Sequence, residues 1–182
     1  MPSDQISASG VLAETYAASV TAGEVFLRGA LLRSAQIAGA ITGAYELTRT
    51  SIKQRVQFGK PIAGFQSVQI HLVELAQAAT LTTLCVERAA RAAATGTASL
   101  EIVATKSVAN RHAGLAARAA HQAHGAIGMT REYRLQHLTR RLHTWRGEFG
   151  DETSLNLRLG AAIAGSGGIM AAATSVASTV GV

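Results

Sequence analysis

The sequence contains few aromatic residues, few prolines and a single cysteine. Aromatic side chains make up 4% of its 182 residues, two residues are proline, and the lone Cys85 excludes an internal disulfide. A β-sandwich requires many β-branched and aromatic residues, whereas 48% of this chain is hydrophobic and alanine is heavily used. This composition suits closely packed helices, so we predict an all-α fold.

Charged residues are also scarce, at 15% of the chain against roughly 25% in an ordinary soluble domain. We infer that part of the surface lies against another chain or domain. The net charge is +6 and comes mainly from arginine. The basic residues are scattered along the expected helices with few aromatic residues among them, which argues against a nucleic-acid partner. The arginines could instead serve a pyrophosphate, a CoA phosphate or an acidic neighbouring subunit.

The sequence lacks a long apolar run as well. No uninterrupted stretch reaches the length of about 18 residues that crosses a bilayer. The first residues, MPSDQ, are polar and contain no basic region ahead of an apolar one. We therefore predict no membrane partner, no secretory signal and a cytoplasmic location.

Apolar residues recur at helical spacing over most of the chain. Within residues 65–94 they follow alternating steps of three and four, as in a helix packed in a bundle. We predict an antiparallel four-helix bundle over residues 23–165, between a loose or short-helical segment (1–22) and a low-information tail (166–182). The predicted helices cover residues 23–54, 65–94, 99–124 and 152–164, and a short basic segment ends near residue 145.

Several small or polar residues mark helix ends and contacts. Ser99 predicts the N-cap of the third helix, Gly125 its C-terminal residue, and Asp151 the N-cap of the last helix. Gly39 and Gly43 lie one turn apart in the first helix, and they predict the close approach of another helix backbone.

Three glycine-containing corners interrupt the helical pattern. The first, QRVQFGKPIAGFQ (54–66), contains a proline, two glycines, two phenylalanines and an excess of cations. It presents a guanidinium, amide groups and ring faces, which suit a phosphorylated, flat, aromatic ligand. The other corners are GAIGMTREY (125–133) and RGEFG (146–150).

Histidine pairs are the only arrangement that suggests a metal. His121 and His124 stand three apart on one helical face, and His71 stands three before Glu74. A di-metal bundle needs several carboxylates from different helices, and these are missing from the apolar seams. We therefore predict hydrogen-bonding histidines and no metal site.

Glu148 is a lone acid in the last corner, close to Trp145 in the sequence. If its carboxylate is desolvated, it could work as a base or an acid. An exposed loop glutamate without a catalytic role is the alternative interpretation.

Taken together, these corners resemble the C-terminal helical domain of the acyl-CoA dehydrogenase family. The order and spacing of the motifs hold from about Leu27 to Gly165. This resemblance implies a four-helix bundle that dimerises and helps to bind FAD across the subunit interface. The matching segments are RVQFG (55–59) with Ile62 and FQ (65–66), then HQAHGAIG (121–128), then RL (141–142) through WRGEFG (145–150).

The resemblance also implies which residues bind FAD. Arg55 matches the arginine that contacts the flavin diphosphate of the neighbouring subunit, and Gln57 and Phe58 match positions that line the same cofactor. Ala126 stands where the family often has glycine. The other implied contacts, chiefly with the adenosine diphosphate portion, are Gln122, Gly125 and Ala126, and Gln66 is a further carry-over.

The family reaction is the α,β-desaturation of an acyl-CoA thioester, in which a carboxylate removes the α-proton and the β-hydrogen leaves as hydride to the flavin. Many members place this base in the loop before the last helix, where this chain has Glu148. The acid–glycine pair of the family also aligns with Phe149-Gly150. Other members place the base on the first long helix, near Gly29 here. The resemblance therefore implies Glu148 as the candidate catalytic base.

Family members also have an N-terminal helical domain and a middle β-domain, which supply much of the acyl-CoA pocket and of the flavin contact. This sequence resembles only the third domain. We therefore expect an acyl-CoA dehydrogenase-like subunit or fragment that needs the missing domains or a partner chain. Its expected partners are an acyl-CoA substrate and either further copies of itself or a full-length acyl-CoA dehydrogenase subunit. A non-catalytic helical module for dimerisation or assembly is the alternative.

Overall fold

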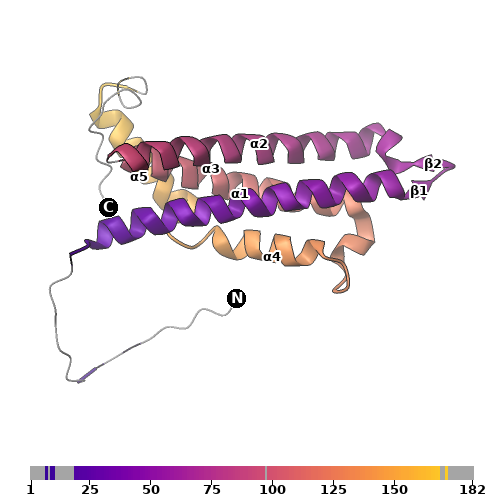
Figure 1. The fold of residues 1–182 in the computed structure, drawn as a ribbon, viewed down its shortest axis with the longest axis horizontal. Helices are drawn as coiled ribbons and strands as arrows, with labels where there is room; N and C mark the ends of the chain where they lie inside the picture. Colours follow the sequence, from indigo (N-terminus) through magenta and orange to yellow (C-terminus); the bar gives the residue numbers. More distant parts are fainter. Residues whose placement is uncertain (1–6, 8, 11–18, 97, 169–170, 172–182) are drawn as a thin grey trace.

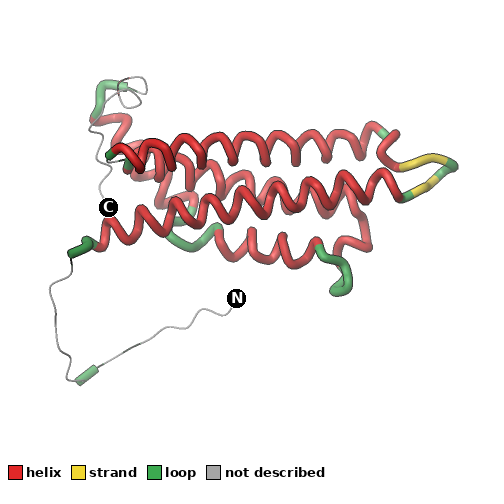
Figure 2. Tube along the Cα trace, in the orientation of Figure 1, coloured by secondary structure: helices red, strands yellow, loops and turns green. Residues whose placement is uncertain are grey.

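The computed structural model describes residues 7, 9–10, 19–96, 98–168 and 171, and most of the predicted N-terminal segment and tail lies outside these ranges. Helices dominate the described part of the chain (Figures 1 and 2). The helices are α1 (Ala22–Gln54), α2 (Gln66–Thr95), α3 (Ser99–His124), α4 (Leu135–Trp145) and α5 (Glu152–Gly165), with two short 3₁₀ helices, η1 (Ile62–Gly64) and η2 (Gly125–Met129), and two short strands, β1 (Val56–Gln57) and β2 (Lys60–Pro61).

The long helices α1, α2 and α3 lie side by side, and α4 completes the bundle along α1 and α3 (Figure 1). The predicted all-α antiparallel bundle is confirmed. One detail of the prediction is wrong, because the basic segment before Trp145 is itself the helix α4 and lies in the bundle. The last predicted helix, α5, packs instead on the first turns of α1 and α3 through Leu155, which is fully buried.

Local sequence explains where the helices begin and end. Thr21 and Glu24 form a capping box at the start of α1, in which the Glu24 amide donates to Thr21 Oγ1 at 3.1 Å and the Thr21 amide donates to Glu24 Oε2 at 2.8 Å. Asp151 caps α5 as predicted, since the Ser154 amide donates to its Oδ1 at 2.9 Å. Ser99 is the first residue of α3 rather than its N-cap, which is Ala98.

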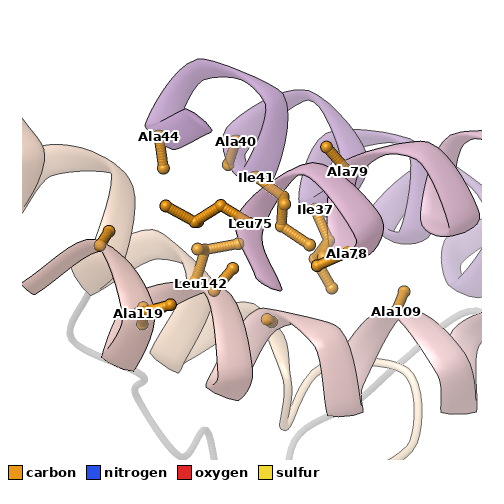
Figure 3. Close-up of a cluster of buried hydrophobic side chains, with 14 of the residues drawn as sticks. Ile37, Ala40, Ile41, Ala44, Leu75, Ala78, Ala79, Ala109, Ala119 and Leu142 are labelled. Atoms are coloured by element: carbon orange, nitrogen blue, oxygen red, sulfur yellow. The ribbon is translucent and has the colours of Figure 1, made fainter. Parts of the chain in front are cut away.

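The core is rich in alanine, and α3 lies at its centre. Figure 3 shows Leu75 of α2 and Leu142 of α4 meeting between the helices, beside Ile37 and Ile41 of α1. Small side chains let the helix axes approach closely while a few large ones fill the remaining space. The buried alanines of α3 are Ala109, Ala113, Ala116, Ala117, Ala119, Ala120 and Ala123.

The predicted close approach at Gly39 is wrong, and Gly43 makes an ordinary contact. A Cβ atom at Gly39 would meet none of the described residues within 4 Å, and one at Gly43 would lie 3.5 Å from Leu138. The close approach is at Gly29 of the same helix, where a Cβ atom would lie 2.2 Å from Cε1 of Phe149. Within the described residues, no helix combines the length and hydropathy of a membrane span.

Candidate functional site

The first corner is a small β-hairpin that projects from one end of the bundle, beyond α1 and α2 (Figures 1 and 2). β1 and β2 pair antiparallel, and Phe58 and Gly59 form the turn with φ of 53° and 77°. Two consecutive left-handed residues are typical of a tight hairpin turn. This geometry leaves the Phe58 ring 91% exposed.

Arg55 joins this hairpin to the end of α3. Its Nη1 donates a hydrogen bond of 2.8 Å to the carbonyl oxygen of His124. The chain then turns at Gly125, whose φ of 65° ends the helix as predicted. The corner and the motif at the end of α3, which are far apart in the sequence, are therefore one surface.

A pocket of about 300 Å³ lies on this surface. Its lining contains most of the residues predicted to bind the cofactor, and Ser67 adds a hydroxyl group. Gln66 and Ala126 are exposed nearby and are not among its lining residues. The lining residues are Arg55, Gln57, Phe58, Ile62, Phe65, Ser67, Val68, Gln122, Ala123 and Gly125.

Aromatic rings extend the pocket outward. Phe58 and Phe65 meet edge to face with centroids 6.0 Å apart, and Lys60 Nζ lies 4.6 Å from the centroid of the Phe65 ring. The corner therefore combines cations, amide groups and ring faces. This combination can bind an anion beside a flat apolar group.

The donor set fits the diphosphate of a dinucleotide such as FAD. The bond to His124 fixes the direction of the Arg55 guanidinium, which still has further N–H donors for a second acceptor. A Cβ atom at position 125 would lie 3.7 Å from Arg55 Nη1, so glycine leaves the cation accessible to a ligand here. The amides of Gln57 and Gln122 add neutral donors and acceptors to the same pocket.

The two histidines near the end of α3, His121 and His124, lie behind this surface and hydrogen-bond to neighbouring residues. His124 is buried, with Nδ1 2.8 Å from the Ala120 carbonyl oxygen and Nε2 3.2 Å from the Tyr133 hydroxyl. Burial lowers the pKa of His124, and the charge of Arg55 adds to this effect. Nε2 of His121 lies 3.1 Å from Thr139 Oγ1. These contacts give three of the four ring nitrogens of the pair a partner, whereas Nδ1 of His121 is buried without one in the part of the chain that the structure describes. The described residues contain no cluster of three or more candidate metal ligands.

The second candidate region is the loop of residues 146–150, which joins α4 to α5 at the opposite end of the bundle (Figure 1). Its acid, Glu148, is half-buried and forms an ion pair with Arg33 of α1. The Arg33 guanidinium also lies over the Trp145 ring, 5.1 Å from the centroid. The carboxylate is therefore held in place by a cation on its own chain.

Phe149 occupies the hollow above Gly29. Its φ of 52° is left-handed, and the next residue, Gly150, has φ of 99°. Gly29 and Phe149 are the two other positions at which the family resemblance would place the catalytic base, and here they are in contact. Both positions are apolar in this chain, and Glu148 is the neighbouring acid.

Comparison with known proteins gives this arrangement a context. Residues 20–172 match the family described as "Acyl-CoA dehydrogenase, C-terminal domain". Over 107 residues the chain is 32% identical to the acryloyl-CoA reductase (NADH) of Anaerotignum propionicum, and this match covers 58% of the chain and 27% of that relative.

Solved structures share the fold. An acyl-CoA dehydrogenase from Geobacillus kaustophilus is similar with a TM-score of 0.71 and 25% identity, over 75% of this chain and 36% of that one. The structure of PigA with FAD and proline is similar with a TM-score of 0.72 and 23% identity, over 76% and 36% of the two chains. The present chain therefore spans little more than a third of the length of these proteins.

Proposed function

Because the chain belongs to the acyl-CoA dehydrogenase family, whose C-terminal domain it matches over residues 20–172, we propose that it is one component of an FAD-dependent acyl-CoA dehydrogenase. The observation that carries the proposal is the pocket that brings Arg55, Gln57, Phe58, Gln122 and Gly125 together. A bundle retained only for packing does not need a guanidinium, two amides and an exposed ring around one hollow.

In this proposal Arg55 binds the cofactor diphosphate, Gln57 and Gln122 orient its polar edges, and Phe58 covers an apolar face. The flavin, when bound, supplies the acceptor for the hydride that leaves the β-carbon of an acyl-CoA. Glu148 remains the candidate for removing the α-proton. Since Arg33 is paired with this carboxylate, substrate binding would have to release it before it could act as a base.

The length of α1 supports an oligomeric site. The helix has 33 residues, and its length is therefore about 50 Å. Arg33 and Arg55 are separated by about six turns along this axis. One FAD therefore cannot place its diphosphate at Arg55 and its flavin ring beside an acyl-CoA held at Glu148 of the same chain. We infer that the corner serves the flavin of a neighbouring subunit, either a second copy or a full-length acyl-CoA dehydrogenase.

An apolar row on α2 supports the same inference. Its members are each about half exposed on the outer face of the helix. A row of this kind along one helix is typical of a surface that another chain covers. The residues are Ile70 53%, Val73 54%, Leu81 50% and Leu84 56%.

A second function, a non-catalytic assembly module, is favoured by one specific observation. Phe149 fills the hollow at Gly29, and the nearest acid is neutralised by Arg33. A subunit with this loop could retain the bundle for dimerisation or assembly and bind no cofactor, while another subunit performs the chemistry.

Flavin binding separates the two functions. The full chain, alone and mixed with a full-length homologue, is titrated with FAD and followed by flavin absorbance and fluorescence. We expect Arg55→Ala to weaken FAD binding about tenfold or more, because a charge-assisted hydrogen bond to phosphate is lost. Lys53→Ala removes an exposed cation two residues away and is the matched control.

Circular dichroism should show the same helix content in both variants. Equal FAD affinity for the wild type and Arg55→Ala would remove Arg55 from the site. A chain that takes up no FAD in either setting would leave the assembly module as the function.

A further inference from the structure

Lys106 is a buried cation at the centre of the bundle. Its side chain is fully inaccessible to solvent and is the largest of the fully buried side chains among the described residues. Nζ donates hydrogen bonds to Asn110 Oδ1 at 2.5 Å, to the Trp145 carbonyl at 3.2 Å and to the Gly150 carbonyl at 3.3 Å. All three of these acceptors are neutral oxygens.

The two backbone acceptors lie at the two ends of one loop. Trp145 is the last residue of α4, and Gly150 precedes the Asp151 cap of α5. Asn110, one turn after Lys106 on α3, donates its Nδ2 to the same Gly150 carbonyl at 3.0 Å. Two side chains of the central helix therefore fix the beginning and the end of the segment that contains Glu148.

The protonation state of Lys106 decides how many of these bonds exist. An ammonium has three N–H donors and matches the three acceptors, whereas a neutral amine has two and leaves one oxygen without its donor. Burial, and then the positive charge of Arg33, lower the pKa of Lys106 from 10.5 to about 8. The charges of Glu148 and Asp151 oppose this shift, and that of Arg146 adds to it.

We propose that Lys106 is a positioning residue for the loop of residues 146–150, and that its ammonium sets where Glu148 is held. Release of the proton loosens the loop while the helices keep their packing. The positioning of the loop by Lys106 follows from the hydrogen bonds of its Nζ. The consequence of this positioning for catalysis rests on the proposed function.

The chain contains its own reporter of this event. Trp145 is the only tryptophan, its carbonyl accepts from Lys106, and its ring lies under Arg33. We would record Trp145 emission and acrylamide quenching of the full chain, without flavin, from pH 6 to pH 10. We expect a one-proton transition near pH 8, with stronger quenching above it and unchanged far-ultraviolet circular dichroism.

Variants assign the transition. Lys106→Met should abolish it and leave Trp145 readily quenched at every pH. Asn110→Asp places a carboxylate against Nζ, retains the proton longer and should raise the midpoint by about one pH unit or more. Cys85→Ser removes the half-buried thiol of α2 and should leave the midpoint unchanged.

The proposal is overturned if the transition persists in Lys106→Met, or if it is absent from the wild type. If Lys106→Met does not fold, an unchanged midpoint in Asn110→Asp overturns it equally. Because no flavin is present, failure of this test leaves the result of the FAD titration unaffected. Failure of the FAD titration likewise leaves the positioning role of Lys106 untouched.

Discussion

Phe58-Gly59 at one end of the bundle and Phe149-Gly150 at the other each combine a phenylalanine and a glycine that both have positive φ. Both phenylalanines are left-handed, with φ of 53° and 52°, and both precede a glycine with positive φ. Their side chains are used in opposite ways. The Phe58 ring is 91% exposed beside a polar pocket, whereas the Phe149 ring is 38% exposed and packs onto Gly29.

The contacts around the two turns differ in the same way as the exposure of their rings. The corner at Arg55 makes one long-range side-chain bond, to His124, among those found in the described residues, and it leaves its amides and rings toward solvent. In the loop of residues 146–150, the Gly150 carbonyl is bound by residues of α3, whereas Glu148 and the Phe149 ring contact residues of α1. A phenylalanine and a glycine with positive φ thus expose a ring beside a pocket at one end, whereas at the other end they bury much of a ring against α1. Substitutions should therefore affect ligand binding at the corner and stability at the loop.

The largest effect is expected at Gly29. Gly29→Ala would place a Cβ atom 2.2 Å from the Phe149 ring, so the ring and its loop must move, at a cost of about 2–3 kcal/mol of unfolding free energy. Gly39→Ala makes the same change in the same helix where nothing lies within 4 Å, and it should stabilise by about 0.5–1 kcal/mol. Urea unfolding followed by circular dichroism measures both. Equal effects from the two variants would show that the Phe149 contact contributes nothing.

The second-largest effect is a pH dependence of the unfolding free energy, and it comes from Lys106, which binds the ends of the loop of residues 146–150. Because the pKa of Lys106 is lowered from 10.5 to about 8, the unfolded chain holds a proton between these values that the folded chain has released. Stability should therefore rise with pH across this window, by about 2 kcal/mol. The measurement is the difference between wild type and Lys106→Met in urea unfolding at pH 7.5 and pH 10. A parallel pH dependence in both proteins would remove Lys106 as its source.

The smallest effect compares the two turns directly. Asparagine adopts left-handed φ more easily than phenylalanine and is favoured before glycine in tight hairpins. Phe58→Asn should therefore stabilise by about 0.5 kcal/mol while weakening FAD binding. Phe149→Asn gains the same backbone relief but loses the packing on Gly29, so it should destabilise by about 1 kcal/mol. Thermal unfolding and FAD titration of both variants test whether Phe58 serves ligand binding and Phe149 serves stability. A loss of FAD affinity only in Phe149→Asn would contradict this assignment.

The sequence allowed the helices and much of the pocket to be predicted because both depend on local patterns. Apolar spacing located α1, α2 and α3, Gly125 located the end of α3, and Asp151 located the start of α5. The position of Ser99 was wrong by one residue, within the usual variation at helix ends. Arg55 and Gln122 were identified by family motifs, and the structure places them in one pocket.

The contacts of the loop of residues 146–150 could not be predicted, because the residues that it contacts are distant in the sequence. No local pattern indicates that Arg33 pairs with Glu148, or that Lys106 binds the carbonyl of Gly150. The glycines illustrate the same limit. Gly39 and Gly43 have the spacing of a helix contact, whereas the close contact forms at Gly29 with a ring from another segment.

The straight run of α1 also has a consequence for symmetry. The helix separates the corner at Arg55 from the loop of residues 146–150 by most of its length of about 50 Å. A single twofold axis beside the bundle, level with the middle of α1 and perpendicular to it, would bring the corner of each subunit toward the loop of the other. Both sites of such a pair would then be completed by one interface, with the same residues used twice.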